Sequence, residues 1–185
     1  MVSLMQLWGP IVLSAFVVFI ASSVIHMVLK WHASDYRGLA NEDDVRAAIR
    51  KGNPAQGQYM LPYCSDMKAM STPAMTQKYN EGPNAVLRVL KTGAPNMGSA
   101  LGVWFGFNLV VSLFAAYIAS RTLAAGAEYM TVFRITSAVG FTGYVLGGYQ
   151  EAIWMGKSWS AAFKDTMDGL IYALLMGGCF GWLWP

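Results

Sequence analysis

Long apolar stretches dominate the pattern of hydrophobic and polar positions along the chain. A helix needs about 20 mostly apolar residues to cross the roughly 30 Å hydrocarbon core of a bilayer, and four stretches are that long. They cover approximately residues 8–29, 99–120, 130–153 and 167–184. The pattern therefore predicts an all-α membrane protein with four transmembrane helices.

A polar segment, residues 30–96, separates the first apolar stretch from the second. Residues 30–91 carry 15 of the 23 formal charges, which leaves 8 for the other 123 residues. Charged residues make up 12% of the chain, about half of the roughly 25% that is usual in soluble domains. This segregation argues against an ordinary soluble enzyme. It predicts one membrane domain over residues 1–185, with residues 30–96 inserted between the first two helices.

Lysine and arginine indicate which side of the membrane the insertion faces. In a four-span protein, residues 30–97 and 154–166 lie on one side, and together they hold 11 of the 13 basic residues. The positive-inside rule places this side in the cytoplasm and both termini outside. The net charge of +3 then reflects topology and anionic lipid, and no nucleic-acid partner is expected.

The insertion contains signals for short elements. Asn41 followed by three acidic residues predicts the start of a helix that stops at Gly52, and Ser71 or Thr72 with Pro73 predicts a second one reaching about Tyr79. Residues 58–61 and 85–90 can be extended and pair with each other. Fewer than 70 residues bury little apolar surface, so we expect the insertion to rest on the membrane or on a partner as a docking platform.

Small residues at i, i+4 spacing predict close helix crossings inside the membrane. Asn108 is expected to form an interhelical hydrogen bond near the middle of the second span. The spans show no interruption, which argues against the discontinuous helices of many transporters. The predicted packing residues are Gly102 and Gly106, Gly143 and Gly147, and Ala173, Gly177 and Gly181.

Titratable residues gather at the cytoplasmic ends of the predicted spans. His26, Lys30 and His32 lie at the end of the first span, with His26 and Lys30 on one helical face, and Glu151 and Asp168 fall at a similar depth. We expect an interfacial belt of salt bridges. The alternative is a site for an ion, a proton or a ligand.

Two further patterns concern cofactors. A single axial histidine, His26, can hold a pigment with magnesium at its centre, and the run of Cys64, Met67 and Met70 offers soft ligands of the type that suits Cu(I). The competing interpretations are an ordinary hydrogen-bonded histidine and methionines that fill adaptable contacts. Cys64 and Cys179 fall at different depths, so no disulfide is expected. Apart from these two patterns, we expect contacts with lipid or pigment and no other cofactor.

The stretch Ser22-Ser23-Val24-Ile25-His26-Met27, together with the closing segments 168–172 and 180–185, resembles a group of small, uncharacterised four-helix inner-membrane proteins of bacteria. The resemblance covers most of the chain. It implies a bacterial inner (cytoplasmic) membrane, so that the orientation derived from lysine and arginine places both termini in the periplasm, and it implies no activity and no site residue.

These features favour a non-catalytic role. We expect an accessory or structural subunit of a larger membrane complex, such as a photosynthetic or respiratory one, with other membrane subunits as partners. The alternative is a small transporter or channel that uses the His26, Glu151 and Asp168 cluster. A membrane enzyme or a metal-binding protein is a third class.

Overall fold

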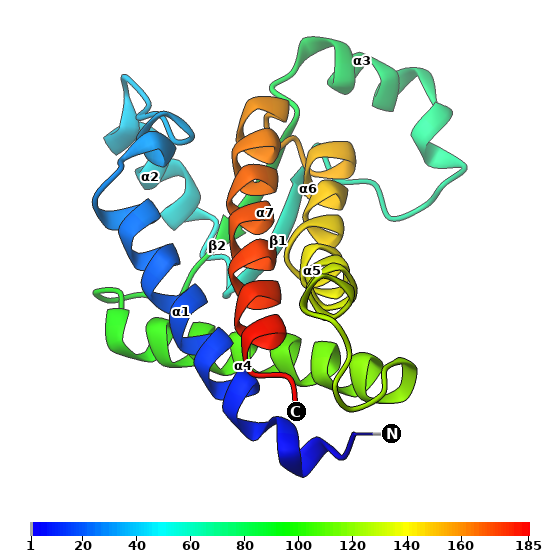
Figure 1. Ribbon diagram of the computed structural model, residues 1–185. Helices are drawn as coiled ribbons and strands as arrows, with labels where there is room; N and C mark the ends of the chain where they lie inside the picture. Colours follow the sequence, from blue (N-terminus) through cyan, green and yellow to red (C-terminus); the bar gives the residue numbers. More distant parts are fainter. Residues whose placement is uncertain (1) are drawn as a thin grey trace. The chain divides into compact units, whose positions relative to one another are not determined.

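Helices form most of the computed structural model, which describes residues 2–185 (Figure 1). The chain divides into two compact units: one runs up to Tyr36 and resumes at Asn96, and the other covers Arg37–Pro95. The first unit contains η1 (Leu4–Leu7), α1 (Trp8–Met27), η2 (Trp31–Ser34), α4 (Met97–Thr122), α5 (Tyr129–Val145), η4 (Leu146–Gly148), α6 (Tyr149–Trp154) and α7 (Trp159–Trp182). The second contains α2 (Glu42–Lys51), β1 (Gly57–Leu61), η3 (Ala69–Ser71), α3 (Pro73–Glu81) and β2 (Ala85–Val89).

Two helical segments within residues 2–185 are long and apolar enough to cross a membrane. They are Leu4–Met27, which joins η1 to α1, and Met97–Thr122, which is α4. Both match predicted spans. The chain is therefore mostly helical with two candidate membrane spans, and the other two predicted spans fall on α5 to α7.

The third predicted span is broken, so the expectation of uninterrupted spans is wrong. α5 stops at Val145, η4 follows, and α6 begins at Tyr149. The consecutive glycines Gly147 and Gly148 lie at this break, where their low helix propensity weakens a continuous α-helix. α7 also begins earlier than expected, at Trp159, because the Ser158 hydroxyl accepts a hydrogen bond from the Ala161 amide and caps the helix.

Each of the four long helices of the first unit packs against two of the others. α1 packs against α4 and α7, while α5 packs against α4 and, over the largest contact, against α7 (Figure 1). Side chains meet across the centre: the Ser14 hydroxyl of α1 bonds to Ser112 of α4 at 2.9 Å, and the Ser112 hydroxyl lies 3.8 Å from the Met176 sulfur of α7. This core places the end of α1 beside the middle of α7.

Glycines set the close approach of α5 and α7. A Cβ built on Gly177 would lie 1.9 Å from the Ser137 hydroxyl oxygen and 3.0 Å from the Phe133 carbonyl, and one on Gly181 would lie 2.7 Å from the Tyr129 ring. Gly140 and Gly169, which the spacing analysis missed, are equally crowded on the same contact. Only glycine allows these two backbones to approach so closely.

The other predicted packing glycines differ from one another. Gly143 lies against Val111, with a built Cβ 3.1 Å from a Val111 methyl carbon. Gly102, Gly106 and Gly147 make no such contact within residues 2–185, because a Cβ built on any of them faces open space, and packing against a helix of another subunit stays a prediction. Their i, i+4 spacing does not coincide with a helix contact: Gly102 is exposed, and Gly147 lies in the break between α5 and α6.

Asn108 also departs from expectation. It is fully buried, yet neither its amide nitrogen nor its amide oxygen finds a hydrogen-bond partner within residues 2–185. Ser112, one turn further along α4, makes the polar links to α1 and α7 instead.

The second unit confirms the local signals read from the sequence. α2 and α3 lie where they were predicted, and the Thr72 hydroxyl caps α3 by accepting from the Met75 amide. β1 and β2 pair antiparallel, with Tyr59 opposite Leu87. Within residues 37–95, Met75 is the only buried residue, so this unit has almost no apolar core of its own.

The α5–α7 contact can be tested with matched alanine variants. Gly177→Ala should lower the free energy of unfolding by about 1–3 kcal/mol, because the new methyl group must displace Ser137 and the Phe133 backbone. Gly102→Ala, with open space around it, should leave stability unchanged or raise it by up to about 1 kcal/mol. Denaturant unfolding in detergent micelles measures both, and equal effects would contradict the assigned contact.

Candidate functional site

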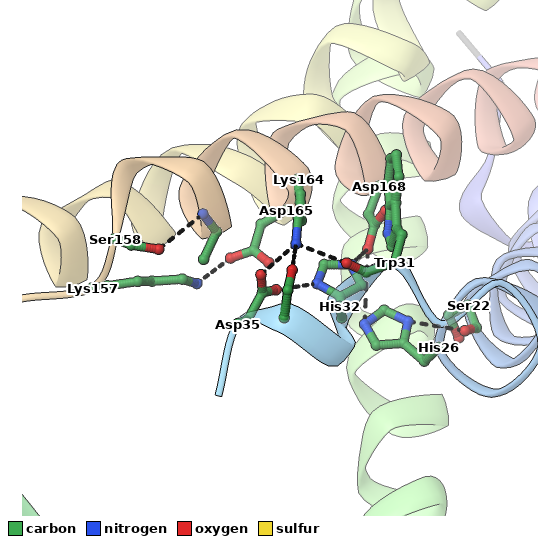
Figure 2. Close-up of polar contacts among 12 residues, drawn as sticks. Ser22, His26, Trp31, His32, Asp35, Lys157, Ser158, Lys164, Asp165 and Asp168 are labelled. Atoms are coloured by element: carbon green, nitrogen blue, oxygen red, sulfur yellow. Dashed lines mark hydrogen bonds and ion pairs between the residues drawn. The ribbon is translucent and has the colours of Figure 1, made fainter. Parts of the chain in front are cut away.

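The candidate site forms where α1 ends beside the middle of α7. α1 ends at Met27, and Lys30 adopts a left-handed conformation with φ of 53° that turns the chain into η2. This turn brings His32 of η2 back toward His26 in the last turn of α1. Figure 2 shows both imidazoles pointing toward Asp168 of α7.

Asp168 is the centre of the group. Its Oδ2 atom lies 2.8 Å from His32 Nε2 and 3.8 Å from His26 Nε2. The two imidazole rings stack face to face, with centroids 4.7 Å apart. One ligand atom from each of the three residues falls within 4.8 Å of the others. Asp168 is buried, with 3% of its surface exposed, whereas the His26 side chain is 52% exposed.

Each histidine is oriented by a hydrogen bond from its other ring nitrogen. His26 Nδ1 donates to the Ser22 backbone carbonyl at 3.0 Å, and His32 Nδ1 donates to Asp35 Oδ2 at 2.7 Å. A carbonyl or carboxylate oxygen can only accept, so both Nδ1 atoms carry protons. Both Nε2 atoms then face the same oxygen of Asp168. His32 thus has a carboxylate oxygen at each of its ring nitrogens.

Lys164 holds η2 against α7. Its ammonium group donates to Asp35 Oδ1 at 2.6 Å, to the Trp31 carbonyl at 2.7 Å and to the Ser34 hydroxyl at 2.8 Å (Figure 2). The hydrogen bond from Lys164 lowers the pKa of Asp35, and the bond from His32 adds to this effect, while burial of the carboxyl opposes it. Asp35 is therefore a carboxylate that can keep orienting His32.

A cavity of about 490 Å³ adjoins the site between α1, α4 and α7. His26 and Asp168 form part of its wall. Two buried polar atoms of the wall residues, Asp168 Oδ1 and the Tyr172 hydroxyl oxygen, have no hydrogen-bond partner within the described residues 2–185. The remaining wall residues are Ser22, Ser23, Met27, Met97, Leu101, Trp104 and Asp165.

Two polar contacts stiffen this wall. The Trp104 indole donates to the Ser22 hydroxyl at 2.8 Å and so ties α4 to α1. Lys157 forms an ion pair with Asp165, the wall carboxylate one turn before Asp168 (Figure 2). Asp168 and His26 belong both to this wall and to the group of His26, His32 and Asp168.

The structure brings together three of the five residues predicted for this cluster: His26, His32 and Asp168. Lys30 does not share a helical face with His26, because α1 ends three residues before it. Glu151 lies in α6, beyond the break at η4, outside both this group and the cavity.

The predicted soft-ligand run lies in the other unit. The Cys64 thiol donates to the Asp66 backbone carbonyl at 3.1 Å, and Met67 and Met70 are exposed. Cys64 and Cys179 are both free.

Sequence reasoning missed Asp35, Lys164 and the Trp104–Ser22 contact. Asp35 follows His32 by three residues and Lys164 precedes Asp168 by four, so both spacings carried a usable signal. The contact between Trp104 and Ser22 spans 82 residues and had no local signal. Comparison with protein-family models, with curated proteins and with solved structures gives no match for the chain.

Two histidines and one carboxylate around a common point can bind a divalent transition-metal ion. Imidazole nitrogen and carboxylate oxygen are ligands for Zn²⁺ and Fe²⁺, and a set of three leaves coordination positions for a further molecule. Ligating histidines usually donate their other N–H to a carbonyl or a carboxylate, as both histidines do here. The same group can also hold a proton on His32 between Asp35 and Asp168.

The attachment of η2 to α7 can be tested by removing the ammonium group of Lys164. Lys164→Met keeps much of the side-chain length but deletes three hydrogen bonds. Amide exchange of Ala33 and Asp35 should then speed up about tenfold or more, since bonds from charged groups contribute about 1.5–3 kcal/mol each. Lys157→Met, which removes a lysine that pairs with Asp165 instead, is the matched control and should leave exchange in η2 unchanged. Unaltered exchange in Lys164→Met would refute the assigned role.

Proposed function

We propose that this protein is a membrane protein that binds a divalent transition-metal ion through His26, His32 and Asp168. The observation that carries the proposal is the orientation of the two histidines. Each uses Nδ1 to donate to a fixed oxygen acceptor and turns Nε2 toward the same Asp168 oxygen. Interfacial salt bridges do not require this arrangement, whereas metal sites commonly have it.

The immediate surroundings support the same proposal. Asp168 is buried and its Oδ1 atom has no partner among residues 2–185, and a cation bound to the carboxylate would offset the cost of burying this charge. A metal ion would bind the unprotonated Nε2 atom of each histidine. The free coordination positions lie on the side of the cavity, because His26 and Asp168 line it.

We further propose four transmembrane helices in a bacterial inner membrane, with α1 and α4 joined by spans built on α5 to α7. Residues 30–96 are then cytoplasmic, both termini are periplasmic, and the metal site lies at the cytoplasmic edge. The distribution of lysine and arginine supports this orientation. The role of an accessory subunit in a larger complex stays a prediction.

Metal analysis of the purified protein tests the proposed site. In maltoside micelles, the protein dialysed against Zn²⁺ or Co²⁺ should retain about one ion per chain and gain thermal stability, by about 2.7 kcal/mol at a hundredfold excess of metal over Kd. His26→Ala and Asp168→Asn should abolish stoichiometric binding. Asp35→Asn, which removes a carboxylate that accepts from both His32 and Lys164, should weaken binding about 10–100-fold.

Asp165→Asn is the control for this experiment. It removes a carboxylate one turn from Asp168, in the wall of the same cavity but outside the three-residue group. Its metal content should equal that of the unaltered protein, with circular dichroism confirming that every variant keeps its helices. A protein that retains no ion, or that binds equally well in Asp168→Asn, would exclude the proposed function.

Thiol labelling tests the proposed orientation. The chain has two cysteines, and Cys179 is buried in α7, so labelling reports on Cys64 in the insertion. In intact cells, an impermeant maleimide should fail to label Cys64, and permeabilisation should expose it. A Cys64→Ser variant supplies the background. Rapid labelling of intact cells would place the insertion outside and reverse the topology.

A further inference from the structure

We infer that the cavity beside the metal site binds a single-chain amphiphile with a carboxylate head group, a molecule of the fatty-acid type drawn from the bilayer. The inference rests on the proposed metal site, because the carboxylate is assigned to the free coordination positions of the ion. Three features of the molecule support the inference: the polarity of the residues that line the cavity, the charges around the metal site, and the exposure of two lining methionines.

The cavity has both polar and apolar lining residues. Ser22, Ser23 and His26 of α1 and two aspartates of α7 are polar, whereas Met27, Met97, Leu101 and Trp104 are mainly apolar. Its volume of about 490 Å³ lies within the roughly 300–1,000 Å³ of small-molecule sites. Such walls match a molecule with one polar end and one apolar body. A ligand with two polar ends would leave one of them without a polar partner.

The charges of the site select the head group. The ammonium groups of Lys164 and Lys157 balance the carboxylates of Asp35 and Asp165. Asp168 remains as a third carboxylate with one negative charge. A divalent ion held by neutral histidines therefore leaves an excess of one positive charge. A singly charged carboxylate restores neutrality, whereas a cationic head group adds to the excess.

Two apolar residues that line the cavity are exposed at helix ends. Met27 at the end of α1 and Met97 at the start of α4 line the cavity, and they are 66% and 65% exposed. Both lie at ends of the two candidate membrane spans. An acyl chain can therefore enter beside these methionines from the bilayer, with its head group directed at Asp168.

Photolabelling tests the inference. A hexadecanoic acid that carries a diazirine on its chain is added to the Zn²⁺-loaded protein in maltoside micelles, and mass spectrometry locates the label. We expect labelling of peptides that contain Met27, Met97 or Leu101. Unlabelled hexadecanoate should compete, whereas hexadecanol, with the same chain and no charge, should not. Chelation of the metal should lower the competed labelling about tenfold or more.

A pair of tryptophan variants separates the cavity from the outer surface of α4. Leu101→Trp fills the cavity and should remove the competed labelling while metal content stays unchanged. Leu113→Trp introduces the same residue at a position that is 46% exposed on α4 and should change neither. This pair distinguishes loss of the amphiphile from loss of the ion.

The outcomes separate the two proposals. If the protein holds the ion but hexadecanoate does not compete, or hexadecanol competes equally well, the ligand class is wrong and the metal site stands. If competed labelling persists after chelation, the head group does not bind through the ion and the inference fails. A protein that binds no ion overturns the inference together with the proposed function.

Discussion

The buried carboxylate of Asp168 is the constraint on which this corner of the structure depends. Removing an ion from water costs several kcal/mol, so a carboxylate that is 3% exposed needs a cation and hydrogen bonds nearby. His32 Nε2 lies 2.8 Å from this carboxylate, and the chain must reverse at Lys30 to bring it there. Asp35 and Lys164 then fix the imidazole from its other side. One buried charge therefore accounts for the end of α1, the position of η2 and the use of Lys164.

The depth of Asp168 follows from the packing of α7 against α5. The residue lies directly before Gly169, where a Cβ would collide with Val145, and on the same contact α7 presents Gly177 and Gly181 to Ser137 and Tyr129. This close approach of backbones draws the middle of α7 into the unit and buries the carboxylate with it. Helix packing and site chemistry are thus linked through neighbouring residues of one helix.

Sequence reasoning succeeded where the signal was local or repeated. Apolar runs at residues 8–29 and 99–120 located α1 and α4 within about two residues of their ends, because hydrophobic length alone defines such helices. Gly102 and Gly106 have no close helix neighbour within residues 2–185, because spacing does not tell which face of a helix meets a neighbour in the same chain. Placing Lys30 beside His26 assumed a continuous helix. The left-handed turn at Lys30 is instead fixed by distant contacts of η2 with α7, which no local pattern reveals.

The proposed metal ion would meet the same requirement of Asp168 that His32 meets. His32 Nε2 lies 2.8 Å from Oδ2 of the carboxylate, and an ion held by the two Nε2 atoms would lie next to the same oxygen. Asp35 would keep its bond to Nδ1, since ligation at Nε2 does not involve that nitrogen. The orientation of His32 therefore does not depend on the ion. The exposure of His26 leaves a route for an ion to a carboxylate that is itself buried.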